Sequence, residues 1–167
     1  MKSIDEKDSN PTHTLDVNYR GTVHLTQTLF PLLRKGSDAR LVNVASQLGH
    51  LHQISSRELA NELSSSTLTL SELDDLVKRY ETSVKSGTHV SEGWGRMSYG
   101  MSKLFLIAAT RIMAREEDKN KTGVKVNSAC PGRCSTDLTG KMIGMLSRTF
   151  GGRSASDGAE TITTLTL

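Results

Sequence analysis

Two short apolar runs separated by one long helical segment constrain the fold of this chain more than any other feature. Arg40–Ser46 and Val124–Cys130 are rich in β-branched residues and lie between turn-forming residues, which predicts two strands. The segment from Met97 to about Asp118 is rich in Ala, Leu, Met, Arg and Glu, which predicts a helix between them. A strand–helix–strand order predicts a right-handed crossover with parallel strands. The predicted fold class is therefore α/β.

Helices are predicted on both sides of this unit. Asn10–Thr12 is typical of a turn that places proline at the start of a helix, and apolar residues then recur every three or four positions to about Arg34. Pro31 is expected to kink or end that helix, because proline lacks a backbone donor. A last helix is predicted to begin near Ser156 and to run to Leu167.

A polar, serine-rich stretch over residues 47–92 is predicted to be a helical insertion on the surface. Ser56–Leu63 has a weak helical pattern, and Thr69–Glu72 matches a capping box that opens a second helix to about Ser86. The length of the chain fits one domain, so residues 1–167 are treated as a single unit that contains this insertion.

Composition and charge exclude several classes of function. The net charge is only +3, and basic residues alternate with acidic ones, as in Arg115–Lys119, so the basic stripe of a nucleic-acid-binding protein is not found. The apolar run Leu104–Ala109 is too short to span a bilayer, and Met1–Glu6 has no apolar core like that of a signal peptide. We therefore expect a cytoplasmic protein with no nucleic-acid or membrane partner.

The two cysteines do not predict a metal site. Cys130 and Cys134 lie four positions apart, with no second pair of thiols and no histidine nearby, which is a poor ligand set for zinc. Two cysteines agree with a reducing compartment. No metal is predicted.

Tyr99 and Lys103 are the first candidate catalytic residues. They lie four positions apart on the strongest predicted helix, so their side chains project from the same face. A free tyrosine has a pKa of about 10 and is a slow proton donor at neutral pH. A nearby ammonium stabilises the phenolate and lowers such a pKa. The spacing alone is weak evidence, because an exposed amphipathic pair has the same pattern.

Three segments bring reactive groups to one edge of the predicted sheet. Ser46 ends the first strand, Pro131–Gly132 ends the second, and Tyr99 lies near the start of the helix between them. In open α/β sheets, ligands bind beyond the carboxyl ends of the strands. A serine at the end of a strand is more often a simple hydrogen-bonding residue, but the convergence of the three segments predicts an active site.

Four motifs, in order, resemble those of the short-chain dehydrogenase/reductase superfamily, and the resemblance runs from about Pro11 to Leu167. The motifs are Val17–Thr22 around Asn18, Val42–Ser46, Tyr99–Lys103 and Val126–Gly132. The resemblance implies a Rossmann-like, doubly wound parallel sheet, of which this chain would hold the C-terminal half as a partial domain.

The resemblance also implies a reaction and a role for each motif residue. Tyr99 would be the general acid in the NADPH-dependent reduction of ketones, aldehydes or quinones to alcohols. Lys103 would lower the pKa of that tyrosine and hold the nicotinamide ribose. Ser46 would bind the substrate carbonyl, and Asn18 would support a water in the proton relay. The cofactor-binding residues implied are Tyr99, Lys103, Pro131, Cys134 and Thr136.

A long insertion between Ser46 and Tyr99 is typical of the monomeric carbonyl reductases, and Glu92–Trp94 resembles their motif. Plant monomeric ketone reductases carry a similar insertion. The insertion is expected to cover the face that other members use to dimerise, so we expect a monomer that acts on a small-molecule carbonyl substrate. Arg133 stands where the resemblance to the carbonyl reductases implies a bulky aromatic residue. It would favour anionic or polar substrates if it faces the pocket; the alternative is that it points to solvent.

The glycine-rich turn that binds the cofactor's pyrophosphate in this family is not found in the sequence. Gly21 is the first glycine, and the Gly151–Gly152 pair follows no predicted strand. Residues that select NADPH over NADH would also lie upstream. Two hypotheses stay open: the chain is the catalytic part of an NADPH-dependent carbonyl reductase, or it is a truncated, catalytically inactive protein that at most binds partners.

Overall fold

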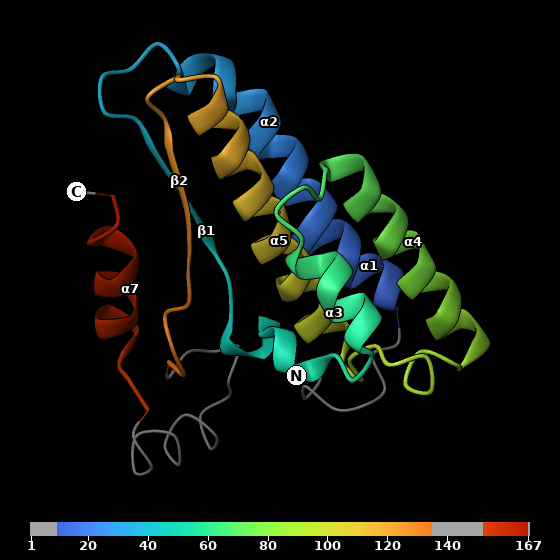
Figure 1. Ribbon diagram of the computed structural model, residues 1–167. Coiled ribbons are helices and arrows are strands. Elements are labelled where there is room, and N and C mark those ends of the chain that lie inside the picture. The colour runs from blue at the N-terminus through green and yellow to red at the C-terminus, as the bar shows by residue number, and fades with distance from the viewer. Residues whose placement is uncertain (1–9, 135–151, 167) are drawn as a thin grey trace.

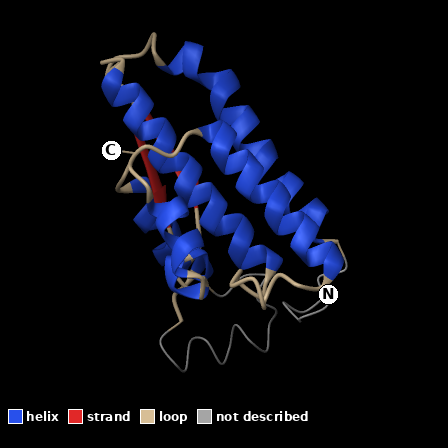
Figure 2. Cartoon of the chain, turned by 45° about the vertical axis from the view of Figure 1, so that its right-hand side comes forward, coloured by secondary structure: helices blue, strands red, loops and turns tan. Residues whose placement is uncertain are grey.

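The computed structural model describes residues 10–134 and 152–166 of the chain. Two strands form a small sheet, with most of the helices on one side of it and α7 on the other (Figure 1). Turned by 45°, the strands lie largely behind the helices (Figure 2). Helices on both faces of a parallel sheet are the arrangement expected of a doubly wound α/β fold.

The sheet pairs the two predicted strands in parallel. β1 (Arg40–Val44) and β2 (Lys125–Ala129) are in register from one end to the other, with Asn43 opposite Ser128. Both strands are slightly shorter than predicted. The buried Asn43 donates a hydrogen bond of 2.9 Å from Nδ2 to Oγ1 of Thr110 and so ties the sheet to the helix that covers it.

Helix α5 (Ser98–Lys119) is the centre of the molecule. It contacts both strands and five helical segments of the described chain, and more than half of its residues are buried. A helix that is covered on most sides needs apolar residues around most of its circumference. This requirement explains why α5 carries buried apolar residues along most of its length.

The N-terminal helical segment departs from the prediction. α1 (Pro11–Leu15) begins as expected, capped by Asn10, and α2 (Thr22–Leu33) continues through Pro31 before it ends. Pro31 therefore lies inside α2, which ends two residues after it and close to the predicted end at about Arg34. The irregular part is the π-helical turn η1 (Asp16–Gly21), well before the proline.

The insertion forms the two predicted helices, α3 (Arg57–Ser64) and α4 (Leu70–Ser86), after the short turns η2 (Gln47–Gly49) and η3 (Leu51–Gln53). Both hydrogen bonds of the predicted capping box at the start of α4 are present. The inner faces of α3 and α4 pack into the same core as α5. The buried apolar residues that they contribute are Leu59, Leu63, Leu73, Leu76, Val77 and Tyr80.

The last helix, α7 (Ala155–Thr163), begins near the predicted position and ends four residues before the predicted end. Its capping box joins Ser154 and Asp157.

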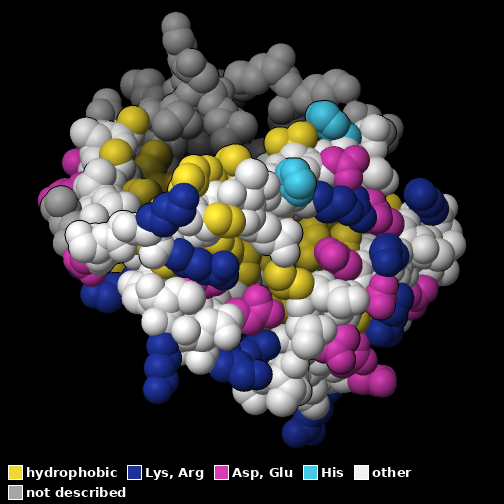
Figure 3. Space-filling model, turned by 90° about the horizontal axis from the view of Figure 1, so that it is seen from above, with side chains coloured by type: hydrophobic (Ala, Val, Ile, Leu, Met, Phe, Trp, Pro, Cys, Tyr) yellow, Lys and Arg dark blue, Asp and Glu magenta, His cyan; other side chains and the backbone are white. Residues whose placement is uncertain are grey.

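The surface seen in Figure 3 mixes acidic and basic side chains without a stripe of one sign. Within residues 10–134 and 152–166, no helix is long and apolar enough to cross a membrane.

Candidate active site

The carboxyl ends of the two strands deliver the predicted segments to one edge of the sheet. Val44 lies opposite Ala129, and the next backbone N–H, that of Ala45, donates 2.8 Å to the carbonyl oxygen of Ala129. Ser46 follows β1 and Cys130–Pro131 follows β2 at this edge. The parallel pairing therefore brings together the two loops that the sequence predicted would meet.

Ser46 is held by the short turn that follows it. Its Oγ accepts a hydrogen bond of 3.2 Å from the backbone N–H of Leu48 and caps η2. Gly49 then packs directly on α5, since a Cβ at that position would lie 2.8 Å from the backbone carbon of Lys103. Only a residue without a side chain allows this approach. The segment after Ser46 is thus pressed against the turn of α5 that carries Lys103.

Tyr99 and Lys103 share one face of α5, as their spacing predicted. The Lys103 Nζ lies 5.8 Å from the centroid of the Tyr99 ring. The same Nζ donates a hydrogen bond of 2.9 Å to the carbonyl oxygen of Val44. The ammonium therefore joins the start of α5 to the end of β1, two residues before Ser46.

Burial lowers the pKa of Lys103 below that of a free lysine. The negative charge of Cys130, when its thiol is ionised, acts in the opposite direction and offsets part of this shift. Cys130 also accepts hydrogen bonds from the backbone N–H groups of Gln47 and Gly132, at 3.1 and 3.4 Å. This thiol thereby links the loops after the two strands.

Asn18 reaches α5 from the π-helical turn η1. Its Nδ2 donates a hydrogen bond of 3.1 Å to Oγ of Ser102, and that hydroxyl donates 2.7 Å to the backbone carbonyl of Tyr99. Ser102 is fully buried. The sequence did not single out Ser102, although it lies inside the Tyr99–Lys103 motif, because nothing in the local pattern separates it from a core serine.

The loop after β2 turns at Gly132, whose φ is 80°. Cys134 Sγ donates 3.3 Å to the carbonyl oxygen of Pro131 and sits against Gly158 of α7, where an added Cβ would lie 2.2 Å from the sulfur. Arg133 is exposed, which agrees with the alternative that it points to solvent. Thr136 lies outside the described residues.

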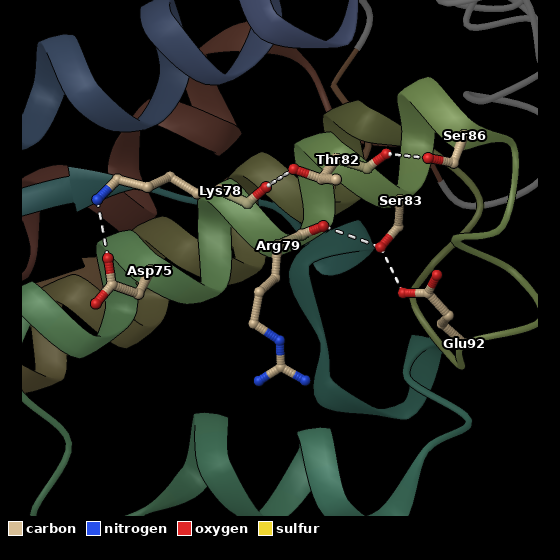
Figure 4. A pocket seen from close by; sticks show the side chains of 7 residues that line it. All are labelled: Asp75, Lys78, Arg79, Thr82, Ser83, Ser86 and Glu92. Atoms are coloured by element: carbon tan, nitrogen blue, oxygen red, sulfur yellow. Dashed lines mark hydrogen bonds and ion pairs between the residues drawn. The ribbon is translucent and has the colours of Figure 1, made fainter.

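A hollow of about 410 Å³ on the outer side of α4 contains none of the described residues that the sequence predicted to be catalytic or cofactor-binding (Figure 4). Its polar side chains form hydrogen bonds with one another. Lys78 donates to Asp75 at 2.8 Å, and Ser83 donates to Glu92 at 2.5 Å. We assign no chemistry to it. Its lining residues are Asp75, Lys78, Arg79, Thr82, Ser83, Ser86 and Glu92. Among residues 10–134 and 152–166, no group of three or more His, Cys, Asp or Glu side chains could hold a metal ion.

Comparison with known proteins identifies the family. No protein-family model matches the chain. Carbonyl reductase [NADPH] 1 of Oryctolagus cuniculus is 36% identical over 143 residues, which cover 80% of this chain and 50% of the relative. Carbonyl reductase [NADPH] 3 of Homo sapiens is 34% identical over 131 residues, which cover 77% of this chain and 47% of the relative. The chain belongs to the short-chain dehydrogenase/reductase superfamily.

The solved structures agree with this assignment. Salutaridine reductase from Papaver somniferum superimposes with a TM-score of 0.80 and 28% identity, over 94% of this chain and 50% of that one. Menthone neomenthol reductase from Mentha piperita gives a TM-score of 0.66, also at 28% identity, over 80% of this chain and 44% of that one. This short-chain dehydrogenase/reductase chain spans about half the length of the curated relatives it matches.

Proposed function

We propose that this chain supplies the proton-donating and substrate-orienting part of a carbonyl reductase site, with NADPH as the hydride donor. The observation that carries the proposal is the position of the Lys103 ammonium, 5.8 Å from the centre of the Tyr99 ring and bonded to the end of β1. A phenol beside an ammonium at the carboxyl edge of a parallel sheet is suited to general acid catalysis.

Tyr99 would donate the proton to the carbonyl oxygen as that oxygen gains negative charge. Lys103 would stabilise the phenolate that remains, because an opposite charge nearby favours the ionised form. Ser46 Oγ already accepts a hydrogen bond from Leu48, which leaves its own proton to bind the same carbonyl oxygen. Asn18 uses one amide proton on Ser102, so its amide oxygen would be the acceptor for the water of the relay.

The residues present fit the nicotinamide end of the cofactor. An ammonium has three donor protons, so Lys103 can bind a ribose hydroxyl while it keeps its bond to Val44. Pro131 and Cys134 lie in the loop after β2, at the same edge of the sheet. Bound NADPH would supply the hydride for the carbonyl carbon. The sequence offers no glycine-rich turn for the pyrophosphate.

A second function, partner binding without catalysis, is favoured by an apolar stripe on α2. Leu25, Leu29 and Leu32 follow the helical repeat and are 57%, 38% and 62% exposed. The buried face of α2, which includes Phe30, is a different one, so the helix is apolar on two sides.

Turnover in a fusion protein separates the two functions. The fusion joins the part of the Oryctolagus cuniculus carbonyl reductase that precedes the matched region to this chain, from Pro11 onward. We expect it to oxidise NADPH when a ketone is added, and we expect the 167-residue chain alone not to do so. A folded fusion that binds NADPH without turnover would favour the partner-binding function.

A further inference from the structure

The residue directly after Asn18 is anchored to the insertion. Tyr19 is 1% exposed, and its hydroxyl donates a hydrogen bond of 2.7 Å to Asp74 of α4. Burial and the neighbouring carboxylate both raise the pKa of Tyr19, so its hydroxyl keeps its proton and remains a donor. A buried hydroxyl that binds a carboxylate fixes the backbone to which it belongs.

The next residue makes a second contact to the same helix. Arg20 binds Glu81 of α4 through both guanidinium nitrogens, at 3.1 and 2.5 Å, and also binds Asp16 at 2.6 Å. Asp16 and Arg20 both belong to the π-helical turn η1. Arg20 therefore forms one ion pair inside η1, with Asp16, and a second one with Glu81 of α4. The Glu81 side chain is 12% exposed. Bidentate pairs of this kind fix orientation as well as distance.

Asp74 and Glu81 lie seven positions apart, which places them two turns apart on one face of α4. Asn18 stands beside Tyr19 and Arg20 in η1 and reaches Ser102 on α5. A single π-helical turn inside a helix is irregular and is frequent at functional sites. In this protein, the contacts to Asp74 and Glu81 of α4 hold η1 in place.

The same helix also contacts the residue before Tyr99. The hydroxyl of Tyr80 lies 3.3 Å from Oγ of Ser98, and both residues are buried. The Tyr80 ring packs edge to face on Trp94 and Phe105, with centroids 5.6 and 5.9 Å away. This aromatic packing holds the Tyr80 hydroxyl against the first turn of α5.

We propose that α4 is a positioning element of the catalytic site. Asp74 and Glu81 fix the turn that presents Asn18, and Tyr80 fixes the turn that presents Tyr99. The inference rests on the proposed function, because that function makes Asn18 and Tyr99 parts of one proton relay. The insertion then sets the geometry of the site in addition to covering α5. Small displacements of catalytic groups cost large factors in rate.

The test compares two double variants of the 167-residue chain. Asp74→Ala with Glu81→Ala removes the two carboxylates that bind η1. Glu62→Ala with Asp75→Ala is the control, because it also removes two negative charges. Among the described residues, it breaks the ion pairs of Glu62 with Arg79 and of Asp75 with Lys78, and neither pair involves η1. NMR measures the exchange with water of the Asn18 side-chain amide protons, with amides of α3 as internal references.

We expect exchange at Asn18 to become about tenfold faster in the first double variant and to stay unchanged in the control. When Asp74 is replaced by Asn instead of Ala in the first double variant, part of the protection of the Asn18 amide protons should return. The amide oxygen of Asn can still accept a hydrogen bond from the Tyr19 hydroxyl. Tyr19→Phe keeps the ring and its packing, so it serves if the double variant does not fold. Equal exchange at Asn18 in the folded variants and the control would overturn the proposal.

Tyr80→Phe tests the second contact in the fusion protein. It removes one hydroxyl and keeps the aromatic packing, so we expect kcat to fall while KM and the Kd for NADPH stay the same. Unchanged kcat would remove Tyr80 from the positioning element. Lack of any turnover that depends on Tyr99 would contradict the proposed function instead, and the exchange measurement at Asn18 would still decide the role of Asp74 and Glu81.

Discussion

The Lys103 ammonium donates a hydrogen bond of 2.9 Å to the carbonyl oxygen of Val44, so one side chain fastens the start of α5 to the end of β1. These two residues lie 59 positions apart in the sequence. The bond places the predicted acid and its ammonium beside the loop that carries Ser46.

The 167-residue chain should bind NADPH weakly. The residues proposed to bind the nicotinamide end of the cofactor are present. The sequence has no glycine-rich turn, however, and such a turn is what binds the pyrophosphate in sites of this kind. Titration with NADPH, followed by the fluorescence of the cofactor, checks this. Saturation in the micromolar range would show that other residues of the chain bind the phosphates.

Lys103 should lose its proton at lower pH than Lys78. Burial lowers the pKa of Lys103, whereas the bond to Asp75 raises the pKa of Lys78. Between the folded pKa of Lys103 and its unfolded value, the unfolded chain binds more protons there, so the contribution of Lys103 to the free energy of unfolding rises with pH. The contribution of Lys78 is present at low pH and is lost as the pH rises through its folded pKa.

NMR titration of isotopically methylated lysines checks this order, with Lys103→Arg and Lys78→Arg to assign the two signals. If both lysines titrate together, the ammonium beside Tyr99 is as solvated as one on the surface.

Tyr99→Phe should lower the kcat of the fusion protein by ~10²–10⁴, the usual value of general acid catalysis. The Kd for NADPH should change little, because the ring and its packing remain. Lys103→Ala should lower kcat and also weaken NADPH binding, since the ammonium has two roles. Steady-state kinetics and cofactor titration at matched folded fraction measure both effects.

Lys125→Ala is the control for the lysine change, because this side chain is 57% exposed and pairs only with Asp38 among the described residues. We expect nearly unchanged kinetics for it. Near-normal kcat in Tyr99→Phe would show that this tyrosine is a surface residue without a catalytic role.

Asn43→Ala should lower the free energy of unfolding by about 1–3 kcal/mol, because the buried hydrogen bond is lost and the Thr110 hydroxyl no longer accepts it. Asn43 is 5% exposed and bonds to the buried Thr110 of α5. Asn127→Ala on the neighbouring strand is the control, because that side chain is exposed. Urea denaturation of both variants gives the free energies of unfolding, and equal losses would mean that the bond between β1 and α5 contributes little.

The fusion protein should be a monomer. α4 packs against α5 and covers a side of that helix with the buried residues Leu73, Val77 and Tyr80. A surface already covered within one chain is not free to pair with a second copy. Light scattering over a range of dilutions checks this, and a dimer mass that persists on dilution would contradict it.

The local sequence determined the elements whose signals are local. The β-branched runs gave two parallel strands, the composition of α5 gave a long helix, and Thr69 with Glu72 gave the start of α4. The four-residue spacing of Tyr99 and Lys103 placed both on one face, because the helical repeat alone requires it.

Tertiary structure decided what depends on contacts between distant segments. Asn18 meets Ser102 across 84 positions, and Tyr19 meets Asp74 across 55. The π-helical turn at Asp16–Gly21 has no local marker comparable to Pro31, where the sequence predicted the irregularity. A helical repeat shows which residues share a face, but only packing against α4 and α5 determines what that face binds.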